Sequence, residues 1–92
     1  MRIYSYFSLP TDIAEAMRDW PEFVSGEEYS VELKDGTTGE QVTIQLMDAE
    51  EAETQPYVLI QSNQFGTLYE KAVGRAIIEL LPHTDNLMID SL

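Results

Sequence analysis

Two neighbouring stretches of the chain alternate apolar and polar residues in the way that half-buried β-strands do. Residues 29–34 place Tyr, Val and Leu at every second position, and residues 41–47 repeat the pattern with Val, Ile and Leu. Asp35-Gly36 begins the turn between them, and Gly39 ends it. This pattern predicts a β-hairpin with one side facing the core and the other facing water.

Two further stretches have the spacing of amphipathic helices. Apolar residues fall at positions 13, 16, 17 and 20, and Pro21 then stops the helix. A second apolar stripe runs from Tyr69 to Leu80 and ends before Pro82. Thr67 and Glu70 match a T-x-x-E capping box, which predicts that the second helix begins there.

The remaining segments complete a small sheet. Residues 2–7 and 87–89 predict short strands, and residues 22–26 predict a loop. Residues 57–61 are apolar at nearly every position, which predicts a central strand covered on both sides. The whole of 1–92 therefore reads as one α+β domain of order β-α-β-β-β-α-β. A small antiparallel sheet, formed by a 28–62 meander plus the terminal strands, packs with two helices.

The charge is strongly negative and unevenly distributed. The chain has 17 acidic residues against 5 basic ones, which gives a net charge of −12. Residues 12–53 hold thirteen of the acids and only two bases, Arg18 and Lys34. Such a field repels nucleic-acid backbones and anionic lipid, and it attracts basic surfaces. We therefore expect no direct binding of nucleic acid and no binding to a membrane.

The sequence shows no motif for catalysis or for a cofactor. There is no cysteine, which excludes thiol chemistry and favours a reducing cytoplasm. His83 is the single histidine and has no visible partner, so we interpret it as a solvated turn residue. The acids of 48–53 lack the glycine that a calcium loop requires. No stretch is long and apolar enough to span a membrane. We expect a protein that is not an enzyme and has no metal or cofactor.

The remaining signal is a set of carboxylates on the predicted hairpin and beside it. Alternate residues of a strand lie roughly 6.6 Å apart, which is of the order of the phosphate spacing in a nucleic-acid strand. Tyr29, Met47, Trp20 and Phe23 are candidate apolar anchors within the acidic rim, although we expect Tyr29 and Trp20 to lie in the core. The predicted partner-binding residues are Glu28, Glu32, Asp35, Glu40, Asp48, Glu50, Glu51 and Glu53.

These observations favour a binding protein. A small, acidic chain without cysteine or catalytic motifs is similar in class to phage-encoded anti-CRISPR and anti-restriction proteins, although no motif matches a particular family. The leading hypothesis is an inhibitor that imitates nucleic acid and blocks the nucleic-acid site of a basic protein or complex. One alternative is an immunity protein that neutralises a basic nuclease toxin. Another is a homo-oligomeric adaptor or structural protein, with a homodimer formed through the 71–78 helix face.

Overall fold

The computed structural model describes residues 1–5, 13–47, 56–83 and 87–90. In this part of the chain there are six strands, two α-helices and a short 3-10 helix. In chain order they are β1 (Arg2–Ser5), α1 (Ile13–Arg18), β2 (Phe23–Glu27), β3 (Ser30–Lys34), β4 (Gln41–Met47), β5 (Tyr57–Ser62), α3 (Thr67–Leu80), η1 (Leu81–His83) and β6 (Leu87–Asp90).

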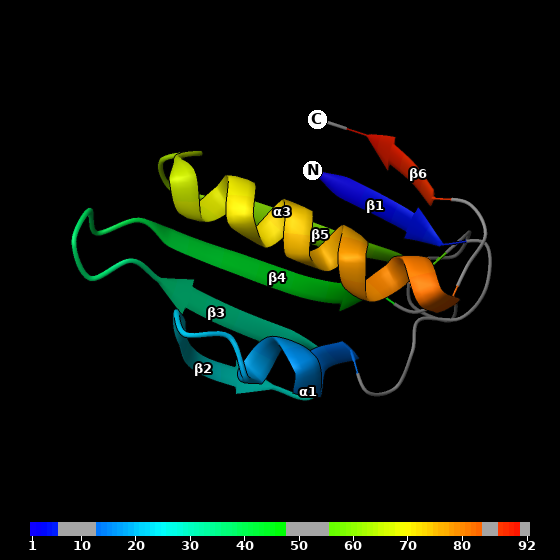
Figure 1. Cartoon of the computed structure of the whole chain (residues 1–92), viewed down its shortest axis with the longest axis horizontal. Coiled ribbons are helices and arrows are strands. Elements are labelled where there is room, and N and C mark those ends of the chain that lie inside the picture. Colours follow the sequence, from blue (N-terminus) through cyan, green and yellow to red (C-terminus); the bar gives the residue numbers. More distant parts are fainter. Residues whose placement is uncertain (6–12, 48–55, 84–86, 91–92) are drawn as a thin grey trace.

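All six strands form one antiparallel sheet, in the order β2-β3-β4-β5-β1-β6 (Figure 1). The strands β2 to β5 follow one another as a meander. The first and last strands of the chain then pair beside β5, with Ile3 opposite both Val58 and Ile89. Strands β2 and β6 are consequently the two edges of the sheet.

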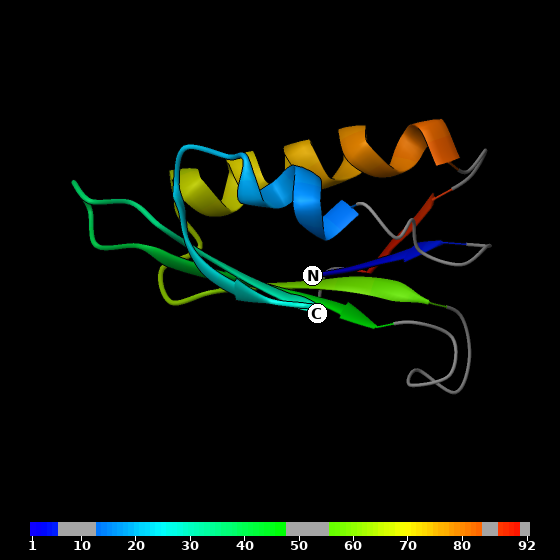
Figure 2. The same ribbon diagram turned by 90° about the horizontal axis from the view of Figure 1, so that it is seen from below.

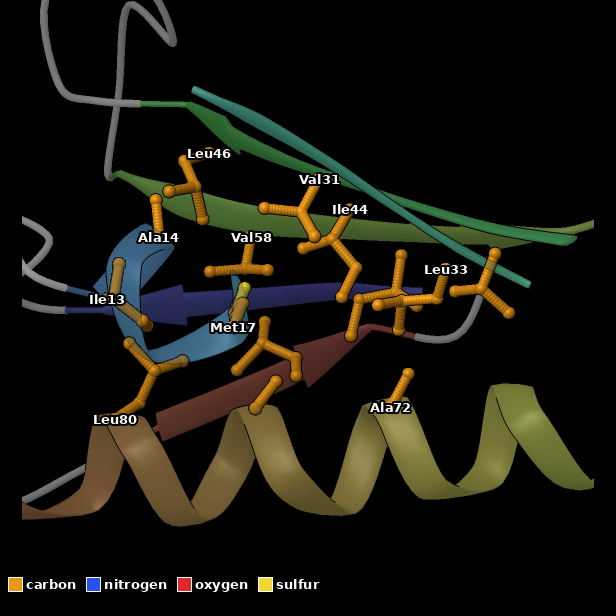
Figure 3. Close-up of a cluster of buried hydrophobic side chains, with 14 of the residues drawn as sticks. Ile13, Ala14, Met17, Val31, Leu33, Ile44, Leu46, Val58, Ala72 and Leu80 are labelled. Carbon is orange, nitrogen blue, oxygen red and sulfur yellow. The ribbon is translucent and has the colours of Figure 1, made fainter. Parts of the chain in front are cut away.

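The molecule has two layers, because α1 and α3 lie on the same side of the sheet (Figure 2). We call this side the helix face and the opposite side the open face. Alternate strand residues point to the helix face and pack against apolar residues of both helices (Figure 3). The buried core contains Ile3, Ile13, Ala14, Met17, Val31, Leu33, Val42, Ile44, Leu46, Val58, Ile60, Leu68, Ala72, Ala76 and Leu80.

The predicted α+β class, the antiparallel sheet and the two helices are confirmed. The predicted loop at 22–26 was wrong, because Phe23–Glu27 forms strand β2 and pairs with β3. Ser25 and Gly26 have little intrinsic preference for strands, but backbone pairing with β3 overrides it. A register shift between Phe23 and Ser25 breaks the simple alternation that would have revealed the strand.

The prediction for residues 57–61 was correct in one respect and wrong in another. Strand β5 lies inside the sheet, between β4 and β1, as expected of an apolar strand. Its two sides nevertheless differ: Val58 and Ile60 are buried under the helices, whereas Tyr57 and Leu59 are only half-buried on the open face. Apolar residues therefore occur on a side of the sheet that neither α1 nor α3 covers.

Arg75 of α3 contacts two residues of the segment that follows α1, Glu22 and Trp20. Arg75 donates a hydrogen bond from Nη1 to Oε1 of Glu22 at 2.5 Å, and its guanidinium lies 5.5 Å from the centre of the Trp20 ring. This ion pair takes the place of the pairing between Arg75 and Glu79 that helical spacing allows. The hydrogen bond from Arg75, against the opposing effect of burial, lowers the pKa of Glu22.

Candidate functional site

The negative charge of the described residues is concentrated in one part of the fold. Residues 13–47, which form α1, β2, β3 and β4, contain eight acidic residues and two basic ones. The other described residues contain three of each and carry no net charge. The asymmetry of the sequence is therefore an asymmetry in space, because α1, β2 and β3 occupy one border of the molecule (Figure 1).

Three exposed glutamates gather at the hairpin formed by β2 and β3. Glu27 ends β2, Glu28 lies in the turn, and Glu32 lies on β3. Glu27 and Glu32 share the open face with Ser25, whose hydroxyl donates to Oε2 of Glu32 at 3.2 Å. We call Glu27, Glu28 and Glu32 the acidic edge. The β2–β3 hairpin thus carries two of the predicted residues, Glu28 and Glu32, and a third exposed glutamate, Glu27, that was not predicted.

Glu27 was missed because residues 22–26 were interpreted as a loop, which left no strand from which to project its side chain. On β2 the side chain lies on the same sheet face as that of Glu32. One basic side chain lies nearby: Nη2 of Arg18 donates to the backbone carbonyl of Glu27 at 2.8 Å. Arg18 contacts a main-chain oxygen, so this hydrogen bond does not involve the Glu27 carboxylate.

Asp35 has a structural role at the turn between β3 and β4. Its Oδ1 accepts hydrogen bonds from the backbone N–H groups of Thr37 at 2.8 Å and Thr38 at 3.2 Å. These two bonds favour the ionised carboxylate and lower the pKa of Asp35. Asp35 therefore shapes the hairpin tip, and its replacement would alter the turn as well as the surface charge.

Glu40 lies inside the protein, with 2% of its surface exposed, and not on the predicted acidic surface. Its carboxylate caps the start of α3. Oε2 accepts from the N–H of Gly66 at 2.8 Å, the N–H of Tyr69 at 3.1 Å and the hydroxyl of Ser62 at 2.8 Å. Oε1 accepts from the N–H of Leu68 at 3.0 Å. A carboxylate from the residue that precedes β4 thus satisfies backbone donors that a helix leaves unpaired.

Burial and hydrogen bonding act on Glu40 in opposite directions. Burial opposes ionisation, but the bonds from Ser62, Gly66, Leu68 and Tyr69 together outweigh it and hold the pKa of Glu40 below its usual range. Because the carboxylate is buried and fully used in this cap, Glu40 does not belong to the partner-binding residues that we propose below.

The predicted capping box, with Thr67 as the cap residue of α3, was wrong. The cap residue of α3 is Gly66, and glycine has no side chain that could bond to the N–H groups of the helix. The helix is capped from a distance of 26 residues along the chain, by Glu40. A side chain at position 66 would meet this cap directly, because a Cβ atom there would lie 2.9 Å from Oε1 of Glu40.

Some of the other predicted site residues are described by the structure, and some lie outside the described residues. Asp48, Glu50, Glu51 and Glu53 are in the second group. Among the candidate anchors, Trp20, Phe23 and Met47 are half-buried. Tyr29 is 51% exposed at the β2–β3 turn, and hence its expected place in the core was wrong.

The surface beside the acidic edge has shallow hollows. One is lined by Ser25, Gly26, Glu27, Ser30 and Glu32, and another extends from Glu32 and Val24 towards β4. Val24 is 57% exposed and adds an apolar side chain at the border of the sheet. The acidic edge therefore has an exposed apolar side chain and shallow hollows beside its carboxylates.

Neither a metal centre nor a membrane helix is found in the described residues. No three of their potential ligand side chains are grouped so as to hold a metal ion. None of their helices has the length and apolar character needed to cross a bilayer. His83 ends η1.

The predicted homodimer through residues 71–78 stays a prediction, and it can be tested. Ile78 is 68% exposed on α3, and a Cβ atom at Gly74 would meet open space. If this face forms a dimer, sedimentation velocity at about 0.5 M salt, where charge repulsion is screened, gives twice the monomer mass. Ile78→Glu then restores the monomer, whereas Leu81→Glu in the following turn serves as a neighbouring control. A single monomeric species at high concentration would contradict the prediction.

Comparison of the chain with protein-family models, curated proteins and solved structures gave no match. The candidate site therefore stands on its geometry alone.

Proposed function

We propose that this protein is a non-enzymatic inhibitor that binds a basic nucleic-acid-handling protein or complex through its acidic edge. It covers the surface that the partner uses for nucleic acid and acts in the cytoplasm of the cell that contains the partner. The proposed mode of action is that of anti-CRISPR and anti-restriction proteins.

The observation that carries this proposal is that, among the described residues, the net negative charge lies within 13–47, with exposed carboxylates on β2, on β3 and in the turn between them. Exposed charges of one sign steer an oppositely charged partner and orient its approach. Val24 and Tyr29 lie beside these carboxylates and supply apolar contact area. Charge alone brings many basic partners to the surface without selecting one. Apolar contacts are what convert such an encounter into a specific complex.

The immunity-protein alternative uses the same surface on a different partner. A basic nuclease toxin would meet the same carboxylates, so the acidic edge supports both functions equally. A nuclease gene directly beside the gene for this chain would favour the toxin as the partner, whereas neighbouring phage genes would favour inhibition of a defence complex.

The proposal is tested by capture and competition. The protein is immobilised and incubated with a lysate of host cells, and the retained proteins are identified by mass spectrometry. We expect a retained protein that binds nucleic acid, and we expect duplex DNA or single-stranded RNA to displace it from the immobilised chain. In the converse assay, the free protein should prevent the partner from binding a labelled oligonucleotide.

Retention of a partner that binds its oligonucleotide equally well with and without this protein would contradict the proposal. Cleavage of the oligonucleotide by the isolated chain would contradict the assignment as a non-enzyme. If a reference protein of the same net charge retained the same basic proteins equally well, the interaction would be unspecific electrostatic attraction, and the proposal would be contradicted.

A further inference from the structure

The outer side of β2 is an exposed strand edge. Within the described residues β2 pairs with β3 alone, and four of its five residues are exposed. A terminal strand presents backbone N–H and C=O groups that no neighbour uses, and it is a template for an additional strand. Glu27 pairs with Ser30 across the turn, and its carbonyl also accepts from Arg18, so residues 24–26 form the open part of this edge.

The charge beside this edge selects between possible occupants. Pairing of β2 with β2 of a second copy would bring two sets of Glu27, Glu28 and Glu32 together, and their repulsion disfavours that arrangement. A segment rich in lysine or arginine would instead be attracted by these carboxylates. The edge formed by β6 lacks this selectivity, because its one acidic residue, Asp90, lies opposite Arg2.

The spacing of the acidic edge suits an extended segment. In an added strand, every second side chain points to the open face, roughly 6.6 Å from the next one. Glu27 lies on that face at the border, with Glu32 one strand further in. Basic side chains at alternate positions of the incoming strand can therefore reach both carboxylates, while Val24 and the hollow around Ser25 provide neighbouring contacts.

We infer that the partner supplies an extended basic segment, which pairs with β2 as a seventh strand of the sheet. This inference rests on the proposed function and specifies how the same surface recognises its partner. Main-chain hydrogen bonds along β2 supply affinity, and the carboxylates of the acidic edge select a basic sequence.

The experiment uses peptides, so that the protein remains unchanged. The probe is an octapeptide of alternating lysine and valine with blocked ends. A second peptide has the same sequence with every backbone nitrogen methylated, which retains all four charges but removes the amide donors. A third replaces each lysine by glutamate. Binding is followed by the NMR shifts of the backbone amides at increasing peptide concentration.

We expect the first peptide to shift the amides of residues 24–27 and to bind at least about tenfold more tightly than the methylated peptide, with no binding of the glutamate peptide. Glu27→Gln combined with Glu32→Gln should weaken the first peptide. Glu70→Gln combined with Glu79→Gln, which removes the same charge from α3, should leave its affinity unchanged.

Equal affinity of the methylated and unmethylated peptides would overturn strand addition, and so would shifts centred on residues 87–90 or no binding of the first peptide. These outcomes are distinct from failure of the proposed function. A partner that is captured and displaced by nucleic acid while the two peptides bind equally shows an acidic edge that works by charge without strand pairing.

Discussion

Replacing Glu40 by glutamine lowers the melting temperature by roughly 5 °C or more, because at least one donor loses its acceptor. The carboxylate receives four donors through its two oxygens. A glutamine side chain presents one oxygen and one NH₂ group, so whichever way the amide is oriented, an N–H of the cap faces another donor. Replacement by alanine removes both acceptors and has a larger effect.

Two variants control for other causes of this loss. Glu70→Gln makes the same chemical change in the first turn of α3, where Glu70 is exposed, and loses only a small favourable interaction with the helix dipole. Gly66→Ala leaves Glu40 intact but places a methyl group against its carboxylate, and should therefore destabilise as well. Equal melting temperatures for Glu40→Gln and Glu70→Gln would contradict the role of Glu40.

The effect of Glu40 should also depend on pH in a defined direction. Its folded-state pKa lies below the ordinary value of 4.5, so the contribution to stability is complete above that value and is lost as the pH falls through the folded-state pKa. The difference in urea midpoint between the wild type and Glu40→Gln should be constant from pH 7 to about 5 and decrease below 4.5. A difference of the same size at pH 3 would be inconsistent with a carboxylate cap.

Reversing the three charges of the acidic edge slows association with the captured partner by about tenfold or more at low salt. The variant combines Glu27→Lys, Glu28→Lys and Glu32→Lys, three substitutions at exposed positions. Asp35 and Glu40 are left unchanged because their carboxylates hold the turn and the helix. The association rate is measured by surface plasmon resonance at several salt concentrations.

A matched variant reverses Glu70, Glu79 and Asp90, the three acids that the structure describes outside residues 13–47. Both variants change the net charge equally, and a difference in rate therefore reports the position of the charge. The difference should shrink towards 0.5 M salt as the charges are screened. Equal rates for the two variants would show that the total charge, and not the acidic edge, governs association.

The sequence was sufficient for those elements whose side chains follow a regular period. The strands at 30–34 and 41–47 alternate regularly, and α3 has a continuous apolar stripe, so each was located within a few residues. Strand β2 has no such period, since a register shift interrupts it and four of its five residues are exposed. β2 forms because its backbone pairs with β3, and the sequence of residues 23–27 alone does not show this pairing.

The cap of α3 shows a second limit. Thr67 and Glu70 supply the local pattern of a capping box, and the pattern is sound chemistry for an isolated helix. The fold instead brings the carboxylate of Glu40, from 26 residues away, to the N–H groups of Gly66, Leu68 and Tyr69. Glu40 was interpreted as an exposed residue at the tip of the predicted hairpin, because a single sequence does not show which carboxylate will accept hydrogen bonds from the N–H groups of a helix. Two of the predicted site residues, Glu28 and Glu32, are exposed and lie on one hairpin, as expected.

The cap of α3 also provides a built-in reporter. The backbone N–H groups of Gly66, Leu68 and Tyr69 all donate to the carboxylate of Glu40. Their NMR frequencies and solvent-exchange rates should therefore change together when Glu40 takes up a proton. Titrating these three signals measures the ionisation of Glu40 in the intact protein without any substitution. Because the β3–β4 hairpin delivers Glu40 to the helix, the same signals record whether hairpin and helix separate together during unfolding.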